Sequence, residues 1–185
     1  KNGQVDVFLK TNSKLDKDIL DILKAYNITL PIIQKNGNTQ ASLLMKFPYD
    51  TTKNMSTYGE FFLNDAKVAI NNFEFESKNA EVILDDSIIK IKNSDFKYKD
   101  MINATLNLNL DIKTLKSYGD ANIKSFLIKE ENKESLVEIK DKNTAIDLNF
   151  NNEVSILLKD LRTNIKISDL IYVNIDDLSK IYPYS

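Results

Sequence analysis

Apolar and polar residues alternate along most of this chain, most regularly in the stretch MINATLNLNLDIK, residues 101 to 113. One set of alternate positions is apolar: Ile102, Ala104, Leu106, Leu108, Leu110 and Ile112. The other set is polar: Asn103, Thr105, Asn107, Asn109, Asp111 and Lys113. Successive side chains of a β-strand point to opposite faces of its sheet, so the stretch predicts one long strand with an apolar face. Each large aliphatic side chain gains about 1.5–3 kcal/mol on burial, so the rest of the chain or a bound molecule must cover this face.

Shorter alternating runs fill much of the remaining chain at a spacing of about ten residues. Clusters of Asn, Asp and Gly separate them, for example KNGN at 35–38, DD at 85–86 and YGD at 118–120. These residue types form tight turns because they tolerate positive φ or hydrogen-bond to their own backbone. The pattern predicts an antiparallel meander in a single β-rich unit that spans residues 1–185.

Two stretches have the period of a helix instead. In residues 13–27 one face carries Leu15, Ile19, Ile22, Leu23 and Tyr26. Ser13 is the expected N-cap of this amphipathic helix, and Asp16 completes a capping box. Near the C-terminus, residues 174–183 repeat the pattern in a shorter helix that starts at Asn174 and has an apolar stripe of Ile175, Leu178, Ile181 and Tyr182. Either helix would plug one end of the sheet.

A meander can cover its apolar face in two ways. In a closed sandwich, two inner faces cover each other and no ligand is needed. In the other arrangement, an elongated and twisted sheet curls around a furrow that stays open along one side. A closed sandwich usually carries Gly and Pro at its corners, and this chain has only four Gly and three Pro. The strands expected at 38–48 and 101–113 are also long, so the sequence favours the half-open groove.

The order of elements in residues 5–70 resembles a known family. A strand VDVFLK precedes a helix ILDILKAYN, the dipeptide Leu30–Pro31, a linker with Gly37, the strand ASLLMKFP that ends at Pro48, and YGEFFLNDAKVAI. This order resembles the AsmA-like superfamily of bacterial envelope proteins, of the YhdP and TamB type, over about residues 1 to 130. The chain departs from the family's pattern at ESKN, residues 76–79, where a glycine is often found.

The resemblance implies a module of lipid transport and outer-membrane biogenesis. Such proteins form a long periplasmic β-groove, anchored to the inner membrane, that shields acyl chains while phospholipids pass between the two membranes. This chain would then be a fragment of a larger membrane-anchored protein whose anchor lies outside the segment, and other envelope proteins are candidate partners. The residues expected to line the groove wall and contact acyl chains are Leu43, Met45, Phe47, Ile102, Leu106, Leu108 and Leu110.

Transport of this kind needs no catalytic residue, cofactor or metal, so we expect a non-enzymatic protein. Two alternatives remain. In the first, the same apolar residues form the ordinary core of a closed sandwich that binds or scaffolds another protein. In the second, the chain is a hydrolase that uses only carboxylates, which would have to converge in a cleft.

Composition narrows these classes. The chain has no Cys, His or Trp, which excludes thiol and imidazole chemistry and the usual zinc sites. A net charge of -2 gives no general attraction to phosphates, and Arg162 is the single arginine, so nucleic acid is not an expected partner. In KNSDFKYK, residues 92–99, the aromatic and lysine residues fall on opposite faces, which predicts a half-buried strand.

Candidate carboxylate chemistry is equally sparse. Asp85–Asp86 and Asp176–Asp177 are adjacent pairs, and adjacent side chains in a strand or turn point apart. We therefore expect turns or helix caps at both places. No apolar run approaches the ~20 residues of a membrane-spanning helix.

Overall fold

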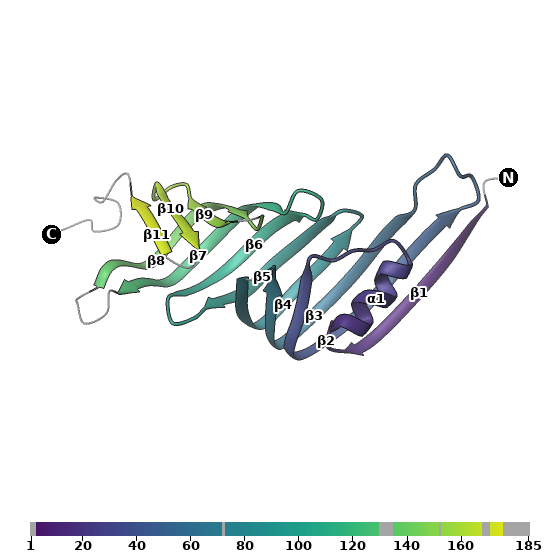
Figure 1. The fold of residues 1–185 in the computed structure, drawn as a ribbon, viewed down its shortest axis with the longest axis horizontal. Helices are drawn as coiled ribbons and strands as arrows, with labels where there is room; N and C mark the ends of the chain where they lie inside the picture. Colours follow the sequence, from purple (N-terminus) through teal and green to yellow (C-terminus); the bar gives the residue numbers. More distant parts are fainter. Residues whose placement is uncertain (1–2, 72, 130–134, 152, 168–170, 176–185) are drawn as a thin grey trace.

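The computed structural model describes residues 3–71, 73–129, 135–151, 153–167 and 171–175. These residues form one open antiparallel sheet of eleven strands and one helix. Each strand pairs with its neighbours in sequence, so β1 and β11 are the two edges of the sheet. Figure 1 shows an elongated, twisted sheet with the helix against one face near β1. At the opposite end of the sheet, the short strands β9, β10 and β11 lie near β7 and β8. The expected antiparallel meander is confirmed.

The elements follow one another along the chain in this order: β1 (Gln4–Ser13), α1 (Lys17–Ala25), β2 (Ile32–Pro48), β3 (Ser56–Ile70), β4 (Phe73–Asp85), β5 (Ile88–Tyr98), β6 (Ile102–Asp111), β7 (Lys116–Lys129), β8 (Ser135–Asn149), β9 (Val154–Leu158), β10 (Thr163–Ile167) and β11 (Ile171–Ile175).

Strand β6 is the long alternating strand expected at residues 101 to 113. Its apolar positions from Ile102 to Leu110 are 2–8% exposed, and its polar positions are half-buried or exposed on the opposite face. The strand ends at Asp111, where the side-chain Oδ1 accepts a hydrogen bond from the Lys113 amide (2.7 Å) and forms a turn. The alternation therefore predicted both the strand and its buried face.

The start and the buried face of α1 differ from the prediction. The N-cap is Asp16, whose carboxylate accepts a hydrogen bond from the Ile19 amide (3.3 Å). Ser13 cannot take this role because it pairs with Thr39 at the end of β1. The helix therefore starts later than expected, and its orientation leaves Ile22 51% exposed.

The buried side of α1 packs on the inner face of the first strands. Leu23 is buried, and Tyr26 places its ring 6.4 Å from that of Phe47 on β2. Just before the helix, Leu15 and Gln34 are joined by two hydrogen bonds of 3.0 Å, one of them from the Leu15 amide to the Gln34 side chain. The helix thus covers the β1–β2 end of the sheet.

The prediction of a C-terminal helix is wrong for its first two residues, which form part of a strand. Asn174 and Ile175, its expected first residues, lie in β11 and pair with Asn164 and Thr163 of β10. The other residues of this predicted helix, 176–183, lie outside the described part of the chain.

A row of irregular positions crosses β2, β3 and β5 and bends the sheet. Gly37, Asp65 and Asn93 have positive φ values of 86°, 46° and 42°. The β2–β3 ladder shifts register around Gly37, opposite the region of Asp65. The β4–β5 ladder is interrupted, and the β5–β6 ladder shifts register at Asn93, between Ile91 and Ser94. Such bulges bend strands and increase their twist. We call this row, which runs from Gly37 through Asp65 to Asn93, the crease.

The bend brings distant strands together. Strands β4 and β8 are separated by three strands in the sheet, which is roughly 19 Å in a flat sheet with 4.8 Å between strands. Yet the Asn71 side chain, in the turn between β3 and β4, donates a hydrogen bond to the carbonyl of Phe150 after β8 (2.6 Å). The sheet is therefore strongly curled, and its inner face is largely covered by its own ends.

Candidate functional site

The inner face of the curled sheet encloses an apolar hollow of about 90 Å³. Its walls come mainly from β3 to β6, with further side chains from the segments before β2 and from the end of β8. Leu106, Leu108 and Leu110 of β6 lie on one side, and Phe61 and Leu63 of β3 are among the residues that complete the wall. The surface that faces the hollow is apolar. Such a space favours hydrocarbon over water, because a buried water needs two to four polar partners.

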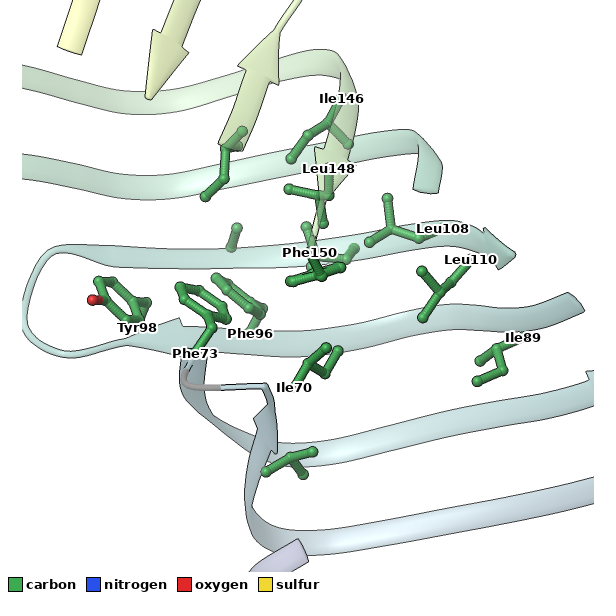
Figure 2. Packing of buried hydrophobic residues seen from close by; sticks show 14 of the residues in the cluster. Ile70, Phe73, Ile89, Phe96, Tyr98, Leu108, Leu110, Ile146, Leu148 and Phe150 are labelled. Atoms are coloured by element: carbon green, nitrogen blue, oxygen red, sulfur yellow. The ribbon is translucent and has the colours of Figure 1, made fainter. Parts of the chain in front are cut away.

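Figure 2 shows a group of aromatic rings within the buried cluster, among them Phe73, Phe96 and Tyr98. The Phe73 ring is stacked on that of Tyr98 with 4.6 Å between the centroids, and it lies 6.1 Å from Phe96. Phe150 approaches the same ring from the other side of the curl at 5.9 Å. Ring pairs at these separations add about 0.5–1.5 kcal/mol each beyond the area they bury. This group, the aromatic plug, joins the β3–β4 hairpin to the end of β8.

The last strands cover the other part of the inner face. A smaller cavity of about 20 Å³ lies between β5–β8 and the strands β9 and β10, lined among others by Ile102, Leu106 and Ile156. Ile165 of β10 is 1% exposed in the same cluster. This part of the molecule is packed like an ordinary protein core.

The structure divides the expected groove-wall residues into three groups. Leu106, Leu108 and Leu110 line the main hollow, and Leu106 also lines the smaller cavity with Ile102. The three expected groove-wall residues on β2 line neither space: Leu43, Met45 and Phe47. Met45 is 0% exposed, and Phe47 packs against Tyr26 at the α1 end.

Other lining residues were not among the expected groove-wall residues. Phe61, Leu63, Val68 and Ile70 of β3 and Phe150 after β8 all face the hollow. The alternation in GEFFL indicated a buried face for Phe61 and Leu63. Val68 and Ile70 lie beyond the crease at Asp65, where the alternation changes phase, and the alternation in AKVAI places both on the apolar face of the strand.

Three serines, Ser77, Ser94 and Ser117, are among the lining residues, although the surface that faces the hollow is apolar. Ser77 and Ser117 line it, each is 4% exposed, and neither hydroxyl has a hydrogen-bond partner among the described residues. A buried hydroxyl without a partner costs about 1–3 kcal/mol. A well-packed core would gain stability from apolar residues at these positions.

Strands β4 and β5 separate beside the hollow. Their ladder pairs Glu76 with Lys97 and Glu81 with Lys92 but is interrupted between these pairs. There Ser94 replaces a backbone partner, since its hydroxyl accepts from the Glu81 amide (3.1 Å) and donates to the Lys92 carbonyl (3.0 Å).

Three residues at this gap, Ser77, Asp95 and Phe96, line both the inner hollow and a wide depression of about 570 Å³ on the outer side. Asp95 forms an ion pair with Lys124 (3.6 Å) in the same region. Because the ladder is interrupted here, few backbone hydrogen bonds hold the two strands together, and such a site opens more easily than a continuous ladder.

The acidic pair at the β4–β5 turn has a structural role. Asp85 forms a hydrogen-bonded ion pair with Lys90 (2.7 Å), which raises the pKa of the Lys90 ammonium above its ordinary value. Asp86 has a φ of 52° and accepts a hydrogen bond from the Thr57 amide (2.8 Å). The two carboxylates thus have separate partners, as expected for a turn. Asp176 and Asp177 lie outside the described residues.

Metal chemistry finds no support in the described ranges, which contain no group of three Asp or Glu residues placed to hold an ion. In the same ranges, no helix combines the length and apolar character needed to cross a membrane. Comparisons of the chain with protein-family models, with curated proteins and with solved structures returned no match.

Proposed function

We propose that this chain is a non-enzymatic lipid-binding module that shelters an acyl chain in the hollow on the inner face of its sheet. The observation that carries the proposal is the hollow itself, about 90 Å³ of space with an apolar surface in the middle of the curled sheet. Each methylene moved from water into such a space gains about 0.8 kcal/mol. Leu106, Leu108 and Leu110 would be in direct contact with the chain.

The size of the hollow sets how a lipid would enter. The space fits a short stretch of one hydrocarbon chain, so a whole phospholipid would need the wall to open further. The gap between β4 and β5 is where such an opening would cost least, since the ladder between these strands is already interrupted. Its position next to the outer depression would leave the headgroup in water while the acyl chain lies inside.

The wider role follows from the resemblance of residues 1 to 130 to AsmA-like envelope proteins. In that role the chain would be a periplasmic piece of a protein anchored to the inner membrane, with phospholipid acyl chains as its cargo. The half-open groove of the family would correspond to this sheet with its furrow partly closed by α1, the aromatic plug and β9–β10.

A second candidate function has its own support. Most inner-face side chains are buried, including Leu43 at 4% and Met45 at 0% exposure, which is the state of a closed sandwich core. In that case the molecule would act through its exterior as a protein-binding or scaffolding module. Phe8, Tyr58 and Phe62 are 57%, 45% and 44% exposed on the outer face and would be available for such a contact.

A fluorescent fatty acid, 11-(dansylamino)undecanoic acid, distinguishes the two functions. The first predicts saturable binding with a blue-shifted emission, and loss of binding in the hollow-filling variant Ser117→Leu. Ser42→Leu is the matched control, because Ser42 lies on the outer side of β2 and lines an outer depression. The emission of the probe should then be unchanged between wild type and Ser42→Leu. Absence of binding in the wild type, together with no phospholipid in solvent extracts of the purified protein, would favour the closed core.

A further inference from the structure

The free edge of β1 is long and regular. Strand β1 pairs with β2 from Gln4–Pro48 to Ser13–Thr39 without a bulge, and within the described chain it has no neighbour on its other side. Proteins usually shorten, bulge or interrupt an edge strand with proline, because its open row of amides and carbonyls pairs readily with another strand. In β1 none of these three features is present.

The ladder with β2 shows which residues present their backbone to this edge. The Tyr49 amide donates to the Gly3 carbonyl (2.9 Å), so Gly3 and Tyr49 form a hydrogen-bonded pair in the same register as the strand. Hydrogen-bonded and non-hydrogen-bonded pairs alternate along an antiparallel ladder. The odd-numbered residues of β1 therefore bond to β2. The even-numbered residues direct their N–H and C=O groups to the free edge: Gln4, Asp6, Phe8, Lys10 and Asn12.

We propose that β1 pairs with β1 of a second copy of this chain, antiparallel, about a two-fold axis at Phe8. In this register Phe8 faces the partner's Phe8. Asp6 faces the partner's Lys10, and Lys10 faces the partner's Asp6. Gln4 is placed opposite the partner's Asn12, and all five of these residue pairs are hydrogen-bonded pairs, which gives about ten backbone hydrogen bonds.

The side chains of the two strands are complementary on both faces. On the outer face, opposite charges meet twice, and opposite-charge cross-strand pairs stabilise a sheet while like charges destabilise it. Phe8, which is 57% exposed, would meet the same aromatic ring across the axis. On the inner face Val7 would lie opposite the partner's Leu9, and Val5, which is 43% exposed, would gain a neighbour.

The rest of the fold leaves the edge accessible. Figure 1 shows α1 on the β2 side of β1, so the helix does not project past the free edge. The contact uses the same patch on both copies, which makes it isologous and closed at two copies. The product would be one continuous sheet with two hollows, and it does not depend on whether either hollow holds a lipid.

Charge reversal provides a direct test. Asp6 and Lys10 are both exposed, so Asp6→Lys and Lys10→Asp can be made without touching the core. Each variant alone should remain monomeric at protein concentrations where the wild type forms dimers in sedimentation-velocity runs. An equimolar mixture of the two variants should form heterodimers, because every like-charge pair then becomes an opposite-charge pair. Lys92→Asp, on the exposed side of β5, is the matched control and should dimerise like the wild type.

Three results would overturn the proposal. The first is a wild type that stays monomeric at all concentrations tested. The second is a dimer that both single variants keep. The third is an equimolar mixture that contains no heterodimer although both variants show wild-type circular dichroism spectra, which would show that Asp6 and Lys10 do not face each other across the contact.

Discussion

Removal of the central ring of the aromatic plug should strongly destabilise the fold. Phe73 is 4% exposed and contacts the rings of Phe75, Phe96, Tyr98 and Phe150, so Phe73→Ala deletes contacts on both sides of the curl. Truncation of a buried Phe to Ala costs about 3–5 kcal/mol. We expect a value near 4 kcal/mol, because the deleted ring contacts rings from β4, from β5 and from the segment after β8.

Urea unfolding followed by far-UV circular dichroism measures this effect. With a slope of about 2 kcal/mol per molar urea for a chain of this size, a loss of about 4 kcal/mol lowers the midpoint by roughly 2 M. The matched control is Phe62→Ala, because Phe62 is 44% exposed on the outer face of β3. Its midpoint should change by less than about 0.3 M, since substitutions at exposed positions rarely change the free energy of unfolding by more than about 0.5 kcal/mol. Equal shifts in the two variants would show that the plug does not hold the curl.

Three further predictions test separate features. Ser117→Val should raise the free energy of unfolding by about 1 kcal/mol, measured in the same urea assay, because it removes a buried hydroxyl without a partner. Gly37→Ala should lower it by about 1–3 kcal/mol, because φ is 86° and the added Cβ would lie 2.4 Å from the Asp65 carbonyl oxygen. The hydrogen bond to Asp85 raises the pKa of the Lys90 ammonium. The stability that this ion pair contributes to the fold is therefore complete below pH 10.5, the ordinary pKa, and is lost as pH rises above the raised pKa. With no histidine in the chain, the thermal midpoint should be constant between about pH 6 and 9 and fall above this range as the Lys90 ammonium loses its proton.

The strands could be predicted from the sequence because alternation is a local signal. In β6 the two-residue period alone was enough to predict which residues from Ile102 to Leu110 are buried. The cap of α1 was missed because Ser13 has the local signature of a cap but forms a ladder pair with Thr39, a contact that a local pattern does not contain. Near the C-terminus the sequence pattern predicted that a helix starts at Asn174, but Asn174 and Ile175 pair with β10 and extend β11 instead.

The hollow could be predicted only in part, because it depends on the curl. The β6 residues of its wall were expected, but Leu43 and Met45 lie on β2 at the end that α1 covers. The bend requires positive φ at Asp65 and Asn93 in addition to Gly37, and the sequence shows these residues only as turn formers within continuous strands. The contact between Asn71 and Phe150 then follows from the bend of the sheet.

A crystal structure with a phospholipid that carries bromine atoms on one acyl chain would show whether the hollow holds that chain. If it does, anomalous difference peaks should lie inside the hollow, beside Leu108 and Phe61, with the headgroup outside near the gap between β4 and β5. Crystals that hold the lipid only on the outer face, with the hollow unchanged at about 90 Å³, would contradict the proposed function.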